Sequence, residues 1–246
     1  MKHFPLLRTR RLTVQLKELT IGDGIRIAAM PSHLEQAEMT AFLRAVTDSV
    51  TNGDHDPAEW TVQERMMAVC HYLASTSDSP DFDVGDSGHF SDYIDASKDC
   101  DSCVPRFLTE LGGDRWMIRP VNGRMVESIE RLLGEVEGLT GRMHWIFGVM
   151  ASSLLREGEE DPKDMTDGAL DEWILERMKV FLAFPQSDFE LLSVAFWEGF
   201  RKLDHFFLID FADSGIVALP IKEGADLPPA RFPSRTCVSP LAKGME

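Results

Sequence analysis

Residues Pro80–Arg106 read PDFDVGDSGHFSDYIDASKDCDSCVPR, and the rest of the chain is arranged on either side of this acidic stretch. It contains the only closely spaced cysteines, Cys100 and Cys103. Between positions 75 and 103, eight aspartates stand against a single lysine, Lys98. Such a run of acid and glycine lacks the apolar periodicity of a helix, so we expect loops with one or two short strands here.

Both flanking parts show apolar residues at helical spacing. Thr61 and Glu64 form the pattern of a capping box in front of an apolar-periodic segment, which predicts that a helix begins there. Cys70 falls on the apolar face of that helix, so its thiol is expected in the core. Residues 33–50 and 141–157 are also predicted to be helical. The helix at 141–157 is apolar nearly all round, so we expect it to be the central helix of the C-terminal part.

Three segments carry strand signals. Residues Arg11–Lys17 alternate apolar and polar side chains, and Arg115–Arg119 is predicted to be a further short strand. Residues Phe206–Leu219 contain two apolar runs around a glycine turn, which predicts a hairpin. The predicted fold is mainly α with a minor β component (α+β), in which helical N- and C-terminal parts enclose a loop-rich acidic insert.

The same patterns divide the chain into four parts. We expect an N-terminal strand plus helical region at 1–78, the acidic insert with the cysteine pair at 79–122, a C-terminal helical region with a hairpin at 123–220, and an extended tail at 221–246. The tail is rich in proline and lacks periodicity, which favours docking against another surface.

Composition narrows the classes of function. The 246 residues are 43% apolar and carry a formal net charge of −16, which suits one large domain or two small ones with an acidic surface. That surface repels phosphate backbones, so we expect no nucleic-acid partner. No apolar run approaches the roughly 20 residues of a membrane span, and the N-terminus lacks the pattern of a signal peptide. Four cysteines are too few for a disulfide scaffold at this length, which favours a reducing, cytoplasmic location.

The sharpest local pattern is Cys100-x-x-Cys103. Two thiolates at this spacing can share a tetrahedral zinc ion, but zinc needs four ligands and the chain has no second CxxC. The candidates for the missing ligands are His71, His89, Cys70 and Cys237. The same spacing also suits redox chemistry, an iron–sulfur cluster held by all four cysteines, or two thiols without a special role.

Sequence patterns of catalysis are missing. The chain has no GxSxG elbow, Walker loop, GxGxxG or HExxH. Asp204 and His205 suit acid–base work, but the sequence implies no serine or cysteine partner for them. His144 lies on an apolar helix, where a core histidine is the simpler interpretation. We therefore predict a protein that is not an enzyme.

Two stretches carry a resemblance to a known group of proteins. They are ELTIGDGIRIAAMPSHLEQAEMTAFLRAV at Glu18–Val46 and WTVQERMMAVCHYLA at Trp60–Ala74, followed by the pair Cys100 and Cys103. Over residues 18–105 the chain resembles baseplate hub assembly chaperones and related tail proteins of contractile-tail bacteriophages. The resemblance implies a non-enzymatic role through contacts with other phage tail or baseplate proteins. The protein would act in the host cytoplasm during assembly or remain in the virion tail, and it could form a homo-oligomer.

Two further hypotheses remain open. The alternative function is a metal-stabilised (zinc) binding or regulatory module centred on Cys100 and Cys103. The third hypothesis is a thiol-dependent or hydrolytic enzyme that uses one of these cysteines or His205, and its thiol version predicts a lowered pKa at one cysteine.

Overall fold

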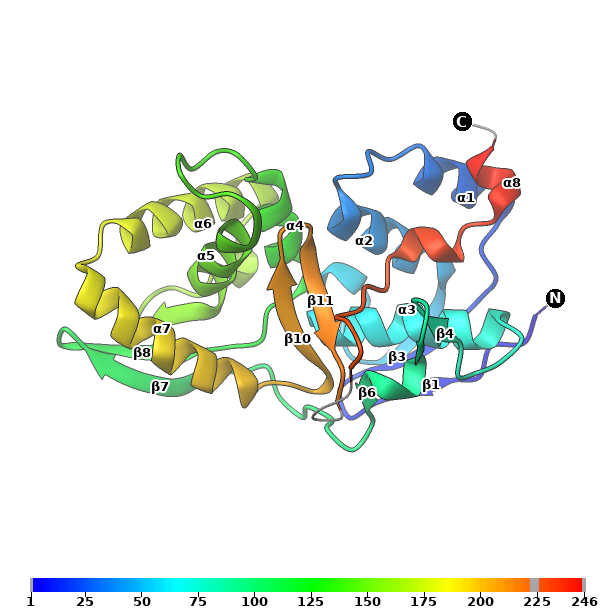
Figure 1. The fold of residues 1–246 in the computed structure, drawn as a ribbon, viewed down its shortest axis with the longest axis horizontal. Coiled ribbons are helices and arrows are strands. Elements are labelled where there is room, and N and C mark those ends of the chain that lie inside the picture. The colour runs from blue at the N-terminus through cyan, green and yellow to red at the C-terminus, as the bar shows by residue number, and fades with distance from the viewer. Residues whose placement is uncertain (1, 222–225, 245–246) are drawn as a thin grey trace.

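The computed structural model describes residues 2–221 and 226–244, which form two lobes lying side by side (Figure 1). The first lobe contains β1 (Leu7–Arg8), β2 (Thr13–Leu16), α1 (Ile21–Ala28), α2 (Glu35–Val46), β3 (Thr47–Asn52), the 3-10 helix η1 (Pro57–Glu59) and α3 (Val62–Thr76). The acidic insert adds β4 (Asp83–Val84), β5 (Gly88–His89), the 3-10 helix η2 (Phe90–Asp92) and β6 (Ile94–Asp95).

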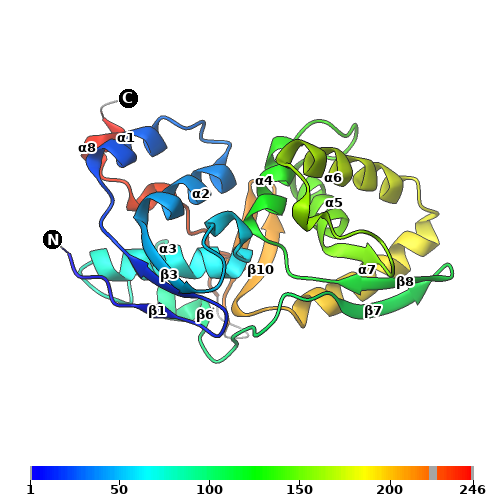
Figure 2. The same cartoon turned by 180° about the vertical axis from the view of Figure 1, so that it is seen from behind.

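The second lobe and the hairpin beside it follow in chain order. Their elements are β7 (Arg106–Leu111), β8 (Asp114–Ile118), α4 (Gly123–Arg131), α5 (Gly141–Ser153), β9 (Leu154–Arg156), η3 (Pro162–Asp164), α6 (Asp167–Leu182), α7 (Gln186–Arg201), β10 (Phe206–Ala212) and β11 (Gly215–Leu219). Figure 2 shows β7 and β8 along one side of this lobe, away from β1 and β3 of the first. In the described part of the chain, no helix combines the length and the apolar character needed to cross a membrane.

The expectation of a mainly α fold is wrong. The chain is 44% helical and 20% strand, with several small antiparallel sheets, and so has a mixed α+β fold. The sheets have the strand orders β1-β2-β3, β11-β10-β6, β4-β5 and β7-β8-β9. The predicted hairpin is confirmed as β10 and β11, which pair antiparallel from Leu208–Leu219 to Ala212–Gly215. Two of the extra strands, β3 and β9, arise where helical patterns stop earlier than the sequence suggests.

The strand β3 is one such place. The helix predicted over 33–50 ends at Val46, and the chain continues as a strand that pairs with β2. Thr47, Asp48 and Ser49 are poor helix formers, because their side chains are β-branched or compete for backbone hydrogen bonds. A partner strand was therefore enough to turn this segment from helix to sheet.

The strand β9 is the second place where a predicted helix ends early and a strand follows. The helix predicted over 141–157 ends at Ser153, and Leu154 to Arg156 pair with β8 as the third strand of a sheet. Leu154 is fully buried. Apolar periodicity cannot separate the end of a buried helix from a short buried strand, so this change was invisible in the sequence.

Helix α3 contributes to both hydrophobic cores. Its start is the predicted capping box, confirmed by the hydrogen bonds between Thr61 and Glu64. Val62, Met66 and Cys70 pack into the large core of the second lobe, which confirms Cys70 as a core thiol. The residues Ala68, Val69 and Tyr72 pack into the core of the first lobe. The two lobes therefore meet along this helix.

The C-terminal segment first pairs with β11 through Ala230 and Ala218, and its end then packs against the first lobe. It contains the 3-10 helix η4 (Ser234–Cys237) and the short helix α8 (Pro240–Lys243), which contacts α1. Arg235 Nε donates to Glu38 Oε2 over 2.9 Å, and this ties the segment to α2. The extended tail expected at 221–246 falls partly on residues 222–225 and 245–246, which lie outside the described residues.

Candidate functional site

The cysteine pair lies in the loop 96–105, which connects β6 to β7 at the boundary between the lobes (Figure 1). Backbone amides hold this loop at two points. The Arg10 amide donates to the Asp99 carboxylate over 2.7 Å, and the Phe206 amide donates to the Lys98 carbonyl over 2.7 Å. Phe206 has a φ of 59°, which is strained for a bulky residue, so the second contact lies at a strained point of the backbone.

The thiols of Cys100 and Cys103 are half-buried and hydrogen-bonded to each other. The hydrogen bond from Cys103 stabilises the Cys100 thiolate and, against the effect of burial, lowers the pKa of Cys100 to about 6. The same hydrogen bond, together with burial, raises the pKa of Cys103 far above that of a free thiol. The pair therefore loses its first proton more readily than a free thiol does. In its protonated form Cys100 Sγ donates to the Ser102 carbonyl over 3.0 Å.

A chain of polar contacts runs along the start of α3 beside this pair. Arg11 Nε donates to Glu64 Oε1 over 3.0 Å, and the Thr61 amide donates to Glu64 Oε2 over 2.9 Å. Thr61 Oγ1 lies 2.8 Å from His205 Nε2. Arg11 lies at one end of this chain, and its positive charge favours the Cys100 thiolate. The capping box that starts α3 thus also positions the groups that act on the cysteines.

His205 is buried, and both of its ring nitrogens are engaged. Its Nδ1 donates to the Leu203 carbonyl over 2.9 Å, which leaves Nε2 of the neutral ring to accept from the Thr61 hydroxyl. Burial raises the pKa of the neighbouring Asp204 to about 6. The ring is therefore held by Thr61 and Leu203, and not by the aspartate that the sequence places next to it.

The other predicted zinc ligands lie elsewhere. Cys70 is in the large core and Cys237 is packed against the small one, while His71 Nε2 donates to the Pro5 carbonyl over 2.8 Å and His89 Nδ1 lies 3.2 Å from Asp83. Among the residues that the structure describes, no three His, Cys, Asp or Glu side chains come together as a metal site. Two thiols next to the Arg11 guanidinium do not complete the donor set that zinc needs. The zinc module stays a prediction from the sequence.

Cys103 borders a cavity of about 480 Å³ between the lobes. The cationic side chains in its wall are largely neutralised by neighbours. Arg119 Nη1 lies 2.5 Å from Asp161, and Arg124 Nη1 lies 3.4 Å from Glu59. This cavity gives small molecules an approach to the cysteine loop, but its paired charges do not point to one ligand.

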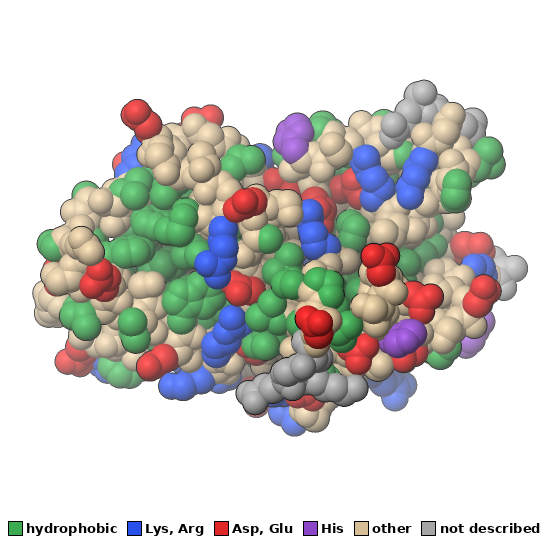
Figure 3. Space-filling model, viewed as in Figure 1, with side chains coloured by type: hydrophobic (Ala, Val, Ile, Leu, Met, Phe, Trp, Pro, Cys, Tyr) green, Lys and Arg blue, Asp and Glu red, His purple; other side chains and the backbone are tan. Residues whose placement is uncertain are grey.

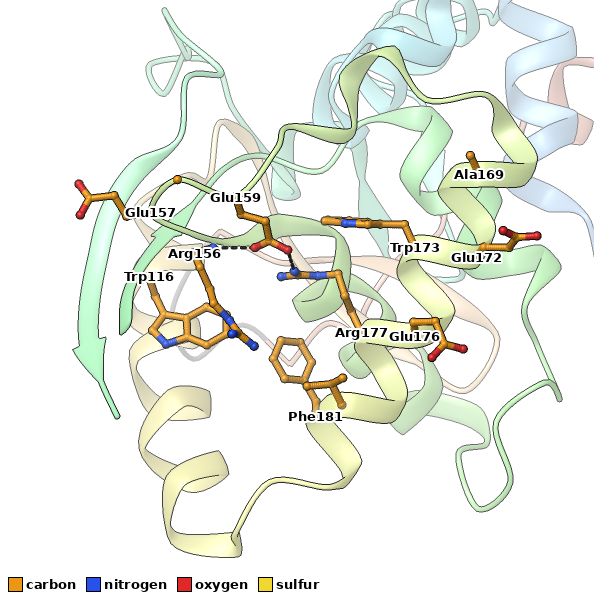
Figure 4. Close-up of a pocket in the computed structure, with 12 residues that line it drawn as sticks. Trp116, Arg156, Glu157, Glu159, Ala169, Glu172, Trp173, Glu176, Arg177 and Phe181 are labelled. Atoms are coloured by element: carbon orange, nitrogen blue, oxygen red, sulfur yellow. Dashed lines mark hydrogen bonds and ion pairs between the residues drawn. The ribbon is translucent and has the colours of Figure 1, made fainter. Parts of the chain in front are cut away.

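A second cavity, which we call the aromatic groove, lies between α6 and the strands β8 and β9 (Figure 4). Its volume is about 760 Å³. Three aromatic side chains line it: Trp116 from β8, and Trp173 and Phe181 from α6. The centroids of the Trp116 and Phe181 rings are 6.1 Å apart, and both residues are buried. Trp173 is the partly exposed ring of the three, and the volume of the groove is typical of binding pockets.

Two arginines pack against these rings. Arg177 Cζ lies 4.4 Å from the centroid of the Trp173 ring, and Arg156 Cζ lies 5.4 Å from that of Trp116. Glu159 forms an ion pair with Arg177 and also accepts from the backbone amide of Arg156 over 2.8 Å (Figure 4). These contacts fix the arginines as part of the wall, because their positive charges face aromatic rings and a carboxylate.

The rim of the groove is acidic. Glu157, Glu172 and Glu176 line it, and Glu172 and Glu176 are exposed on α6. Glu157 forms an ion pair with Arg115 over 2.7 Å, and Glu176 forms one with Lys179 over 2.7 Å. Within the described chain Glu172 forms no ion pair. A ligand that combines an apolar group with a cation would match both the rings and the rim.

Apolar side chains also gather on the outer surface of the second lobe, at the left of Figure 3. On α7, Leu191 and Val194 are 61% and 60% exposed, and on α6 Val180 and Leu182 are also exposed. Val180 lines the aromatic groove as well. Part of this apolar surface is therefore continuous with the groove.

No protein-family model, no curated protein and no solved structure matches this chain. The resemblance to phage tail-assembly proteins is therefore untested by comparison and stays a prediction.

The sequence patterns indicated Cys100 and Cys103 as candidate site residues, but they did not predict the aromatic groove. One signal was visible: Trp173 and Arg177 are four residues apart on a predicted helix, as are Glu172 and Glu176, which places each pair on one helix face. The opposite wall could not be found, because it depends on the pairing of β9 with β8.

Proposed function

We propose that this protein is a non-enzymatic phage tail or baseplate assembly protein that binds a partner protein through the aromatic groove. The observation that carries the proposal is the combination of aromatic side chains inside the groove and carboxylates on its rim. An apolar or aromatic side chain of the partner would lie against Trp173, the partly exposed ring of the groove. A lysine or arginine next to it in the partner would face Glu172 and Glu176.

Two properties of the chain support this kind of partner. The net charge of −16 favours association with basic surfaces, and it does so over distances longer than a contact. The resemblance to tail-assembly proteins covers residues 18–105, whereas the groove lies within residues 116–181. The two lines of support therefore come from different parts of the chain. Whether the protein leaves as a chaperone or stays in the virion is a separate question from binding.

A titration with defined peptides tests the groove. The probe is a short synthetic peptide in which lysine alternates with tryptophan, and its matched control carries glutamate in place of lysine. We expect only the basic peptide to bind. Trp173→Ala and the double change Glu172→Lys/Glu176→Lys should each weaken binding about tenfold or more, which corresponds to about 1.4 kcal/mol.

The matched control variant is Glu18→Lys, which changes an exposed carboxylate of the first lobe. It should leave the affinity for the basic peptide nearly unchanged. Equal loss of binding per unit of charge changed in Glu18→Lys and in Glu172→Lys/Glu176→Lys would show that net charge alone attracts the peptide. Purified tail and baseplate proteins encoded in the same gene cluster then test the biological role. Failure of all of them to bind would contradict it.

A further inference from the structure

The two thiols of the loop 96–105, Cys100 and Cys103, differ from those of Cys70 and Cys237 in their contacts and their exposure. Cys100 and Cys103 contact each other, are partly exposed and are separated in the sequence by two residues. Cys70 is completely buried, and Cys237 is packed against the core of the first lobe. Only the first pair therefore combines contact between two sulfur atoms with access from solvent.

We propose that Cys100 and Cys103 are a modification site that closes reversibly to an intramolecular disulfide by exchange with a low-molecular-weight disulfide such as oxidised glutathione. This inference is independent of the aromatic groove. The contact between the thiols supplies the geometry, since a hydrogen-bonded pair needs only a small shift to bring the sulfur atoms into bonding distance.

The two cysteines have different roles in the exchange. The Cys100 thiolate attacks one sulfur of the small disulfide, forms a mixed disulfide and releases one small thiolate. Cys103 then gives its proton to solvent and attacks the Cys100 sulfur, which expels the second small thiolate. The two protein thiols are thereby oxidised by two electrons, and one small disulfide is reduced to two thiols. Excess reduced thiol reverses both steps.

The surroundings of the pair favour this order. The Arg11 guanidinium stabilises negative charge on both sulfur atoms, whereas the Glu64 carboxylate opposes it on Cys103. Cys103 also borders the cavity of about 480 Å³ between the lobes, which gives a small disulfide a way to approach the pair. Cys100 is therefore the attacking residue and Cys103 the one that resolves the mixed disulfide.

The experiment incubates the full chain with mixtures of reduced and oxidised glutathione, followed by alkylation and intact mass measurement. At oxidising ratios the wild type should lose two hydrogens in mass and two alkylatable thiols, and peptide mapping should place the bond between Cys100 and Cys103. Cys103→Ser should accumulate one glutathione on Cys100, because the resolving thiol is missing. Cys100→Ser should remain largely unmodified, and Cys237→Ser should behave as the wild type.

Three results would overturn the proposal. The first is a wild type that keeps all its thiols alkylatable in a large excess of oxidised glutathione. The second is an equal glutathione adduct on Cys100→Ser and Cys103→Ser, which would mean two independent thiols. The third is one tightly bound zinc per purified chain that protects both thiols, which would favour the metal-stabilised module. Circular dichroism of each variant excludes unfolding as the cause of altered reactivity.

Discussion

At the scale of single residues, Cys100 and Cys103 differ in which of them keeps its proton. Their sequence neighbours are similar, since both follow a polar residue in an acidic loop. The difference arises because Cys103 donates a hydrogen bond to Cys100 and is the more affected by burial. The lowered pKa at one thiol is the property that the thiol-enzyme hypothesis required, but it serves disulfide exchange equally well and implies no substrate.

The pH dependence of alkylation tests this assignment. In the wild type, the rate at Cys100 should rise with a midpoint near pH 6, against about 8.5 for a free thiol. Cys103→Ala removes the hydrogen-bond donor and should move the midpoint upward by more than one pH unit. Cys103→Ser retains a hydroxyl donor and should fall between the two.

The rate itself is a poor readout, because a thiolate of lower pKa is also a weaker nucleophile. The midpoint is therefore the quantity to measure, by mass spectrometry of the peptide that contains Cys100. A midpoint that stays the same in Cys103→Ala would show that other neighbours such as Arg11, and not the second thiol, lower the pKa of Cys100.

At the scale of elements, α3 is held against α2 and α4 by a buried arginine. Arg65 is fully buried, and its Nη2 donates to the Gln36 carbonyl over 2.7 Å and to Thr40 Oγ1 over 2.8 Å. Burial lowers the pKa of Arg65 to about 10, so it remains charged at neutral pH. Gly123, the first residue of α4, leaves the space for its guanidinium: a Cβ there would lie 2.4 Å from Arg65 Nη1.

Gly123→Ala should therefore destabilise the fold. The added methyl group would also lie 2.8 Å from the backbone carbonyl oxygen of Ala58, which cannot rotate away. Overpacking of this kind costs about 1–3 kcal/mol, measured as the free energy of unfolding in denaturant. The control is Gly22→Ala in α1, where a Cβ meets nothing within 4 Å, so that change should be neutral or stabilise by up to about 1 kcal/mol. Equal stability of the two variants would contradict this packing argument.

At the scale of the whole molecule, one carboxylate joins the lobes through α2 and α4. Glu130 of α4 accepts hydrogen bonds from the backbone amides of Gln36 over 2.8 Å and Ala37 over 3.2 Å, at the start of α2. Burial outweighs these hydrogen bonds and raises the pKa of Glu130 to about 7. In the unfolded chain a glutamate loses its proton near about pH 4.3. Between these values the folded state binds more protons, so this residue's contribution to stability is lost as the pH rises.

Glu130→Gln removes this titration and should change the pH dependence of stability. As the pH rises from 5.5 to 7.5, the variant should gain stability relative to the wild type, by at most about 1.4 kcal/mol per pH unit. Denaturant unfolding of both proteins across this range measures the difference. Glu18→Gln, at an exposed carboxylate of the first lobe, is the control and should keep a constant difference. Comparing each variant with the wild type cancels the opposite effect of Cys100, whose lowered pKa adds stability above pH 6.

The features that could be predicted from the sequence are those determined by neighbours along the chain. The capping box of Thr61 and Glu64, the core position of Cys70 and the hairpin at Phe206–Leu219 all follow from spacing within a few residues, and all three are confirmed. The pairing of Cys100 with Cys103 was likewise visible as a pattern, although its chemistry was not. Local spacing is informative because helix caps, helix faces and hairpins bring together residues that are close in the chain.

Only the tertiary structure decided the fold class, the groove and the charge of the cysteines. Thr47–Asn52 and Leu154–Arg156 became strands because β2 and β8 offered partners from distant parts of the chain. The same pairing placed Trp116 opposite Trp173. Arg11 lies 89 positions before Cys100, yet its charge acts on that thiol from beside the start of α3. Strand pairing and electrostatic fields depend on distance in space, which local sequence patterns do not contain.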